Sequence, residues 1–348
     1  MIVSTLAQHR HRLGWSQREL AERSGLSRTE ISAIETGRLV PSTAAALSLA
    51  RAFDCWVEEL FGLAEIGPQG APWAWAPSQP SGRFWQARVG DRVLLFPTEW
   101  TPSSTLCHHG FYQNDRVQLN RPCDPRQTLV IAGCDPAVGL LASHIEAVSD
   151  FRVLSLTRSS GKALELLGQG LVHAAGLHFS AGSSRGENAT AAQSFLGDKF
   201  RLLRVAQWEE GVAVDPSLEV GSIGAVLASD LRWVGRQEGS GARECLDQIL
   251  GRRRRPEGYQ YQALDHHGVA ETIRTGWAQA GVCVRLSAEE RGLQFLKVRE
   301  ESYDLCFPAA EESDPRIQAL LRAVRSTSYR RDLEQLPGYH TGSTGDLQ

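Results

Sequence analysis

Hydrophobic residues recur at intervals of three and four over the first sixty or so positions, which is the pattern of amphipathic helices. The pattern runs from Thr5 to Leu63, with short breaks at Gly14, Gly25, Gly37 and Pro41. We expect Gly25 to adopt the left-handed backbone that ends one helix and turns the chain sharply into the next. The sequence therefore predicts a small all-α domain over residues 1–66.

The helix after Gly25 carries signals for its start and for its buried face. Ser27 is expected to cap it, and Glu30 three residues later completes a capping box. Ala21 should be small because the second helix crosses close above it. The predicted shared core consists of Leu20, Leu26, Ile31, Ile34, Leu47, Ala50 and Phe53. Two helices joined at a sharp turn are thus expected here.

A different composition follows this domain. Residues 67–82 are rich in proline and glycine, which predicts a linker. Within 84–100, two apolar runs flank Gly90-Asp91, which predicts a β-hairpin. We interpret 67–125 as a linker with a small β segment, whose role the sequence leaves open.

From about residue 126, apolar runs that predict strands alternate with helical segments. One helix should open at Asp135-Pro136, and another should cover 159–170. The expected strands are 128–133, 151–157, 172–179, 205–214, 230–237, 280–286 and 293–298. This alternation is typical of a parallel, doubly wound α/β architecture. In such sheets ligands bind at the carboxyl ends of strands, against helix N-termini.

Three predicted strand ends carry small or hydroxyl-bearing residues just before a helix. They are 133–135 (GCD), 159–161 (SSG) and 238–243 (EGSGAR). Together they would offer backbone amides and short donors to one point, which suggests a site for a small anion between two lobes. The alternative is that all three are ordinary helix caps.

The composition narrows the class of protein. Of 348 residues, 42% are hydrophobic and 22% are charged, which is ordinary for a globular chain. The net charge of −3 excludes a polycation, but DNA binding needs only a local basic footprint. No apolar run is long enough to span a membrane, and the N-terminus lacks a signal-peptide pattern. We therefore expect a cytoplasmic protein without a membrane partner.

Seven cysteines occur singly, without CxxC spacing, which argues against a disulfide framework and against a zinc ribbon. Cys107, His108 and His109, with Cys123, offer metal-capable side chains. Adjacent ligands do not easily share one tetrahedral site, so we interpret this stretch as a loop. Neither a metal nor a cofactor is predicted.

Residues 16–42, SQRELAERSGLSRTEISAIETGRLVPS, resemble the helix-turn-helix of phage repressors and Cro, the XRE type. In that family the second helix lies in the major groove and its N-terminal side chains contact base edges. The resemblance implies base contacts by Arg28, Thr29, Ser32 and Ala33, and phosphate contacts by Gln17, Ser27, Thr36 and Arg38. Gln17 and Ser27 would use backbone amides. Glu35 is expected to bond within the fold.

A second resemblance lies in VIAGCDPAVGLLA, GQGLVHAAGLHF, GRQEGSGARECLD, HHGVAETIRTGWAQAGVCV and LKVREESYDL. In this order they resemble the molybdate- and tungstate-binding branch of the type II periplasmic binding proteins. That family implies two α/β lobes joined by two crossover strands. One lobe would hold about 126–206 and the chain from about 292, and the other about 207–290. The predicted fold is thus an all-α helix-turn-helix domain followed by a two-lobed α/β domain over 126–340, with 341–348 as a flexible tail.

The second resemblance also implies a set of ligand-binding residues. In the oxyanion-binding relatives, a hydroxyl after the first strand and one after the second help to hold the anion. Ser159 and Ser160 match the second position, whereas Cys134, a poor donor, stands at the first. Pocket roles are implied for Asp135, His178, Ser240, Gly241, Ala242, Arg243, His267 and Tyr303. Of these, Arg243 would either neutralise the ligand or face solvent on its helix, and Tyr303 would either cover the cleft or be a core aromatic. The basic run 252–255 is interpreted as a solvated loop.

Both resemblances together predict a one-component transcriptional regulator. It would bind double-stranded DNA as a homodimer and sense a small ligand, with the oxyanions molybdate and tungstate first. An organic ligand, a thiol sensor based on Cys134 and a dimerisation scaffold stay open as alternatives. We do not expect an enzyme, because the chain contains no GxSxG, HExxH or GxxxxGK[ST] motif. The effector's identity and the direction of regulation are not encoded in any recognisable motif.

Overall fold

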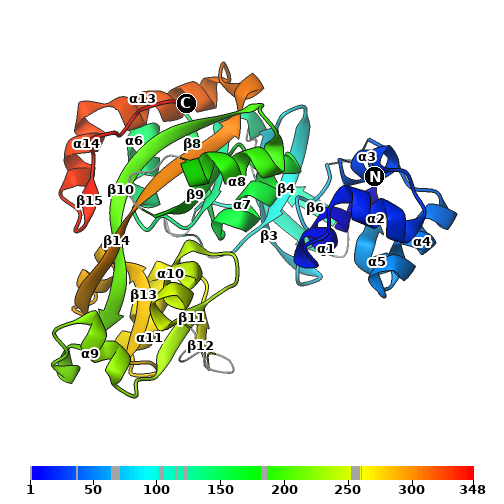
Figure 1. Cartoon of the computed structure of the whole chain (residues 1–348). Coiled ribbons are helices and arrows are strands. Elements are labelled where there is room, and N and C mark those ends of the chain that lie inside the picture. The colour runs from blue at the N-terminus through cyan, green and yellow to red at the C-terminus, as the bar shows by residue number, and fades with distance from the viewer. Residues whose placement is uncertain are drawn as a thin grey trace. The chain divides into compact units, whose positions relative to one another are not determined.

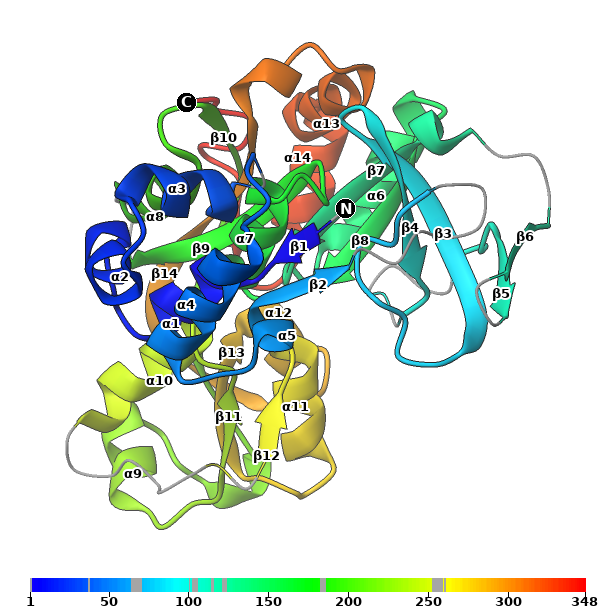
Figure 2. The ribbon, with the colours of Figure 1, turned by 90° about the vertical axis from the view of Figure 1, so that its right-hand side faces the viewer.

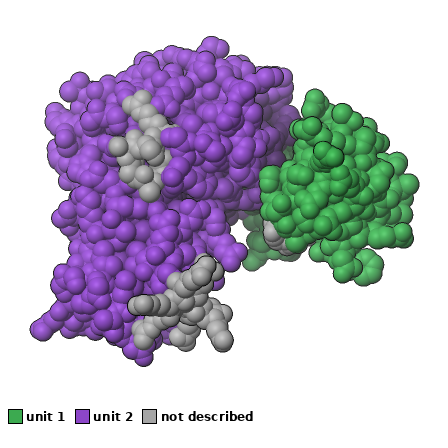
Figure 3. Space-filling view, in the orientation of Figure 1, with its two compact units in different colours: residues 1–82, 95–97, 111–118 green, residues 83–94, 98–110, 119–348 purple. Residues whose placement is uncertain are grey.

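The computed structural model describes residues 2–36, 38–63, 71–99, 101, 106–113, 116–120, 124–181, 186–251, 259 and 261–348 (Figure 1). The chain forms two compact units, coloured separately in Figure 3. Unit 1 consists of residues 1–82, 95–97 and 111–118, and unit 2 of residues 83–94, 98–110 and 119–348. Within the described residues, no helix has the length and apolar character that crossing a membrane requires.

Unit 1 begins with the predicted helical domain. Its helices are α1 (Leu6–Arg12), α2 (Gln17–Ser24), α3 (Arg28–Glu35), α4 (Thr43–Phe53) and α5 (Val57–Leu60). Gly25 ends α2 with a φ of 72°, as the sequence predicted. The hydroxyl of Ser27 accepts from the backbone N–H of Glu30, whose carboxylate accepts from Ser27 N, so the capping box is confirmed.

The core of this domain differs from the prediction at one residue. Leu20, Ile31, Ile34 and Ala50 are buried, and Leu26 and Phe53 pack against them. Leu47 is instead 56% exposed. In α4 the inner face is set by Ala46, Leu49, Ala50 and Phe53, at spacings of three, four and seven, and Leu47 lies about 100° away from Ala46. The prediction for Leu47 was wrong.

The helical pattern also ends earlier than predicted. Phe61–Leu63 is strand β2, which pairs in antiparallel fashion with β1 (Ile2–Ser4). The two ends of the domain are thus joined by a short sheet. The apolar run at 61–63 was read as helix because three residues are too few to show a period.

A four-stranded sheet follows, and its residues are divided between the two units. Its order is β4-β3-β5-β6, with β3 at Ser81–Val89, β4 at Arg92–Pro97, β5 at Gly110–Gln113 and β6 at Arg116–Leu119. The predicted hairpin is β3 and β4, and Gly90 in its turn has a φ of 57°. Strands β5 and β6 were not predicted.

Most of unit 2 is built on one sheet of nine strands, whose main order is β12-β11-β13-β10-β14-β9-β7-β8. The strands are β7 (Thr128–Gly133), β8 (Arg152–Thr157), β9 (Ala174–Ala181), β10 (Phe200–Val214), β11 (Trp233–Arg236), β12 (Tyr261–Ala263), β13 (Ala280–Val284), β14 (Gln294–Pro308) and β15 (Tyr339–His340). The main helices are α6 (Val138–Val148), α7 (Ser160–Gly168), α8 (Gly186–Leu196), α9 (Ile223–Ala228), α10 (Gly241–Leu250), α11 (His266–Arg274), α12 (Arg285–Glu289), α13 (Pro315–Arg325) and α14 (Thr327–Glu334).

The sheet is mixed, whereas the alternation had predicted a parallel one. Pairs β7–β8, β7–β9, β11–β12 and β11–β13 are parallel. Strands β10 and β14, each fifteen residues long, pair with each other and with β13 and β9 in antiparallel fashion. The α/β pattern therefore predicted parts of the two strands between the halves of the sheet, but neither their full length nor their antiparallel pairing.

Strands β10 and β14 run from one half of unit 2 to the other (Figure 1). We call the half with β7, β8, β9, α6, α7, α8, α13 and α14 the first lobe, and the half with β11–β13 and α9–α12 the second lobe. In the second lobe α10 and α11 flank the strands on opposite sides (Figure 2), over two separate apolar clusters. Two crossover strands thus join the two α/β lobes, as expected for the two-lobed fold.

The last eight residues, expected as a flexible tail, lie along β10. Backbone hydrogen bonds join Leu202 and Gln348 in both directions, and Gly345 N donates to Arg204 O. The Thr344 hydroxyl donates to Val205 O at 2.8 Å. The segment is thereby fixed to the first lobe.

Candidate functional site

Helix α3 carries the side chains that the sequence predicts to contact DNA bases. Arg28 and Thr29 are exposed at its first turn, while Ser32 and Ala33 are half-buried one turn later. The Arg28 side chain makes no hydrogen bond or ion pair with any described residue. Thr36 and Arg38 are exposed just after the helix, where Arg38 Nε donates to the Thr36 hydroxyl at 3.0 Å. The base-contact candidates therefore share one helix and remain accessible.

Internal ionic contacts hold this helix in place. Arg10 and Glu35 form a buried ion pair at 2.6 Å, and the Gln17 side-chain amide donates to Glu35 at 2.8 Å. Glu35 thus bonds within the fold, as expected. The Gln17 side chain is engaged, so a DNA contact from this residue would have to come from its backbone N–H at the start of α2.

The predicted strand ends do converge in unit 2. Arg158 N donates to Gly133 O at 3.0 Å, which joins the first junction to the second. A Cβ placed on Gly241 would lie 2.5 Å from the carbonyl oxygen of His178, so α10 of the second lobe abuts β9 of the first. Only glycine permits this approach. The junctions after β7 and β8 therefore lie together in the first lobe, and the junction after β11 in the second lobe abuts strand β9.

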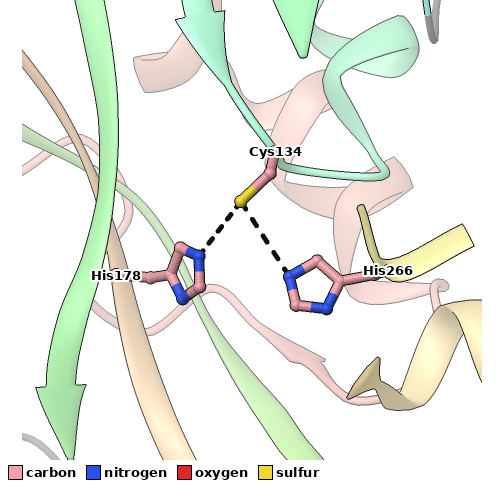
Figure 4. Close-up of side chains that lie close together, drawn as sticks. All are labelled: Cys134, His178 and His266. Carbon is pink, nitrogen blue, oxygen red and sulfur yellow. Dashed lines mark hydrogen bonds between the residues drawn. The ribbon is translucent and has the colours of Figure 1, made fainter. Parts of the chain in front are cut away.

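At this meeting point Cys134, His178 and His266 face one another (Figure 4). Cys134 Sγ lies 3.0 Å from His178 Nε2 and 4.0 Å from His266 Nε2. Cys134 is 4% exposed and both imidazoles are fully buried. Cys134 and His178 come from the first lobe and His266 from the second, so the group spans the two lobes.

His178 is held from behind by a charged network on the crossover strands. Its Nδ1 donates to Glu301 at 3.1 Å, and Trp208 Nε1 donates to the same carboxylate at 3.1 Å. Arg299 forms ion pairs with Glu301 and with Glu210. Burial and the neighbouring Glu301 raise the pKa of Glu210 to about 8 in spite of Arg299.

The pKa values of the two imidazoles are shifted in opposite directions. Burial disfavours a charged His178, but the Cys134 sulfur and Glu210 outweigh it and raise the pKa of His178. Burial, the Arg236 guanidinium and His178 lower the pKa of His266 well below its ordinary value. His266 is therefore neutral, and its Nδ1 is buried without a hydrogen-bond partner among the described residues.

Arg236, at the end of β11, is the buried cation of the site. It is 1% exposed, and its Nη2 donates to Leu264 O at 3.2 Å. Within the described part of the chain, its Nε and Nη1 have no hydrogen-bond partner. Burying a guanidinium with two unsatisfied nitrogens costs folding free energy, and a negatively charged partner would remove this cost.

Several predicted ligand residues lie at or beside this group. Ser160 is buried and its hydroxyl accepts from His178 N at 3.1 Å, while Ser159 is half-buried and forms no cap hydrogen bond. Asp135 accepts from the Tyr339 hydroxyl at 2.7 Å, and burial raises its pKa to about 6. Tyr303 stacks on Trp208 with ring centroids 4.7 Å apart. Its hydroxyl lies where a Cβ on Gly176 would be.

Other predicted residues have local roles. Ser240 caps α10 and donates to Gln237 O at 2.8 Å, so its hydroxyl is engaged. Arg243 pairs with Asp247 at 3.1 Å and stacks over the Tyr259 ring. Ala242 belongs to the apolar core of the second lobe, next to Gly241. His267 lies 3.4 Å from the Ser287 hydroxyl, and the imidazole that faces Cys134 is that of its neighbour, His266.

Sequence reasoning missed Arg236, His266 and the network of Glu210, Arg299 and Glu301. A signal for His266 was present, because it shares a helical face with Val269, Ala270 and Ile273, which are all buried. Arg236 ends an otherwise apolar strand, and that is an unusual place for a charge.

In the stretch Cys107 to His109, which offers metal-capable side chains, both histidines contact other residues. His109 Nδ1 accepts from Gln86 N at 2.7 Å, and His108 Nε2 lies 3.0 Å from the Asn120 amide. Cys107 is exposed, and Cys123 lies outside the described residues. The basic run 252–255 also lies outside them.

Comparisons with known proteins agree with this architecture. A family model described as PBP superfamily domain matches residues 142–325, more than half of the chain, and one described as helix-turn-helix domain matches residues 2–60. The chain is similar to the protein YvgK of Bacillus subtilis (strain 168), with 27% identity over 67% of this chain and 77% of that protein.

Two further similarities concern single parts. The HTH-type transcriptional regulator YgzD of Bacillus subtilis (strain 168) is 43% identical over 16% of this chain and 85% of its own length. The structure of the tungstate ABC transporter from Geobacter sulfurreducens has 14% identity and a TM-score of 0.44, over 58% of this chain and 95% of that one. From the two family matches, the chain belongs to the PBP superfamily and carries a helix-turn-helix domain at its N-terminus.

Proposed function

We propose that this DNA-binding regulator senses a small oxyanion between the lobes of unit 2, with molybdate or tungstate first and sulfate-like anions behind. The observation that carries the proposal is Arg236, whose buried guanidinium has two nitrogens without a partner among the described residues. Each of these N–H groups can donate a charge-assisted hydrogen bond to an oxygen of an oxyanion. Molybdate and tungstate rank first because of the resemblance in sequence.

Other features near Arg236 favour an anion as well. The N-termini of α7, α10 and α11 follow the strand ends that meet there, and helix N-termini attract negative charge. Arg236 also acts on both buried imidazoles and disfavours their charged forms. An anion beside Arg236 would offset this effect of its charge on the imidazoles.

The N-terminal domain would convert anion binding into control of transcription. Arg28, Thr29, Ser32 and Ala33 would contact base edges, with Gln17, Ser27, Thr36 and Arg38 on phosphates. An anion held by residues of both lobes stabilises their closed arrangement. Coupling between anion and operator would amount to about 1–3 kcal/mol, in the same amount in either direction.

The test is thermal unfolding of metal-stripped protein with molybdate, tungstate, sulfate and phosphate. An anion at one hundred times its dissociation constant should add about 2.7 kcal/mol of stability. For a unit of this size the melting temperature then rises by roughly 5–10 °C. Arg236→Gln should abolish the rise. Arg232→Gln, an exposed arginine of the same segment, is the matched control and should retain it.

Two outcomes contradict the proposal. One is a wild-type protein, shown to be free of ligand, that responds to none of the four anions. The other is an Arg236→Gln variant that still gains the full rise, because the anion would then bind elsewhere.

A further inference from the structure

We infer that Cys134, His178 and His266 form a site for a thiophilic divalent metal ion, zinc first, which joins the two lobes. This inference goes beyond the oxyanion proposal, and its three ligands do not include Arg236, the residue that carries that proposal. Thiolate sulfur and imidazole nitrogen are the ligands that zinc prefers in proteins. The three ligand atoms all lie within 4.8 Å of one another, and all three side chains are buried.

The spacing of the ligand atoms suits a tetrahedral ion. With zinc–sulfur and zinc–nitrogen bonds of about 2.3 and 2.0–2.1 Å, a tetrahedral angle separates sulfur from nitrogen by about 3.5 Å. The two separations here, 3.0 Å to His178 and 4.0 Å to His266, lie on either side of this value. Shifts of about half an ångström would bring these two separations to the tetrahedral value.

The surroundings orient one ligand in the way that metal sites require. Glu301 accepts hydrogen bonds from Trp208 and Arg299, so its oxygens act as acceptors toward His178 Nδ1–H as well. That bond places the Nε2 lone pair toward Cys134. A carboxylate behind a ligating histidine is the usual outer partner of protein zinc ions.

Metal binding at this site exchanges one proton for a divalent ion. Before metal binding, one proton is shared between Cys134 Sγ and His178 Nε2. A divalent ion takes the place of that proton, which passes to solvent, while sulfur and both Nε2 atoms supply their lone pairs. The ion and the thiolate together carry one positive charge next to Arg236. The fourth position therefore favours water or an anion, and the group contains no fourth side-chain ligand within the described residues.

A neighbouring group is less suited to a metal. His178, Glu210 and Glu301 also have ligand atoms close together. Arg299, however, already pairs with both carboxylates. A cation would have to displace a guanidinium there, whereas at Cys134 it displaces only a proton.

The test is a titration of the full-length, reduced, metal-stripped protein with Co²⁺ alone, in a buffer without oxyanions. We expect a thiolate-to-cobalt charge-transfer band that saturates at one equivalent and disappears when Zn²⁺ is added. Cys134→Ser should lose the band, and Cys283→Ser, another buried cysteine of unit 2, should keep it. His266→Ala should lose it, and His267→Ala should keep it. Each variant's fold is checked beforehand by circular dichroism.

X-ray absorption on the zinc-loaded wild-type protein gives a test without variants. One sulfur at about 2.3 Å and two imidazole nitrogens at about 2.0–2.1 Å support the site. No band in the wild type, a sulfur count of zero or of two or more, or equal loss in the two histidine variants would overturn it. Because no anion is present, failure here leaves the oxyanion proposal to its own test.

Discussion

At the scale of single residues, His173 shows how a buried histidine can be fixed in its neutral form. Its Nδ1 accepts from Val130 N at 2.9 Å, and its Nε2 donates to Arg88 O at 2.8 Å. A second proton on Nδ1 would face an N–H donor. Burial, reinforced by the Arg316 charge, lowers the pKa of His173 to about 4.

The expected consequence is that the contribution of His173 to stability falls in mild acid. Between pH 6.5 and 4 the unfolded chain binds a proton at His173 that the folded chain does not, so unfolding becomes easier as the pH drops. The loss reaches up to about 3 kcal/mol near pH 4. His173→Gln offers the same acceptor and donor without titrating. In urea unfolding, the stability of the wild type relative to this variant should therefore be lower at pH 4.5 than at pH 7.5.

His340→Gln, at an exposed histidine, serves as the control and should follow the wild type. The stability of each variant is compared with that of the wild type at the same pH, since Asp135 and Glu210, with pKa values raised to about 6 and about 8, act in the opposite sense in every variant. An equal change of stability between the two pH values in wild type and His173→Gln would refute the role given to His173.

Prediction from sequence succeeded for residues whose role is local and was incomplete for residues whose role is set by distant partners. Ser27 and Glu30 cap a helix three positions apart, and both were identified. Glu301 acts on His178 from 123 positions away, and no spacing reveals that pair. The choice of His267 over His266 was avoidable, because the helical period selects His266.

At the scale of elements, the N-terminus of α10 controls how closely the lobes approach. Gly241 begins this helix, and a Cβ there would lie 2.5 Å from His178 O and 2.7 Å from His178 Nδ1. The atoms that this Cβ would meet belong to His178 of the other lobe, whereas within the helix alanine is favoured over glycine. A methyl group at this position should hold the lobes apart.

Gly241→Ala should therefore destabilise unit 2 by about 1–3 kcal/mol and enlarge the protein in solution. Gly224→Ala is the matched control in α9 of the same lobe, since its Cβ would have only the Ser222 hydroxyl nearby, at 3.9 Å. Urea unfolding and small-angle X-ray scattering measure the two effects. A Gly241→Ala protein with wild-type stability and radius of gyration would show that the lobes do not depend on this contact.

Strands β10 and β14 explain why the parallel-sheet prediction was incomplete. The sequence suggested only 205–214 and 293–298 as strands, but both elements span fifteen residues. Residues 299–301 (REE) interrupt the apolar pattern of β14, and Arg299 and Glu301 are nevertheless paired inside the fold. Ion pairs between crossover strands thus hide a buried strand from a hydrophobicity pattern.

At the scale of the whole molecule, a single recognition helix reads too few base pairs for useful specificity. We therefore predict that the full-length chain is a dimer that binds an inverted repeat. Light scattering should give a mass of twice 38.2 kDa at micromolar concentration. Selection from random DNA should yield half-sites whose centres are about one helical turn, 10–10.5 base pairs, apart or a multiple of it.

The spacing itself provides the sharper measurement. Inserting about five base pairs between the half-sites places the second on the opposite side of the duplex, beyond the reach of the second helix. Losing one half-site removes about half of the 4–10 kcal/mol that separates specific from non-specific binding, so affinity should fall roughly 30-fold or more. An insertion of about ten base pairs is the control and should restore part of it. A monomeric protein, or a selected site without two-fold symmetry, would show that each chain reads its operator alone.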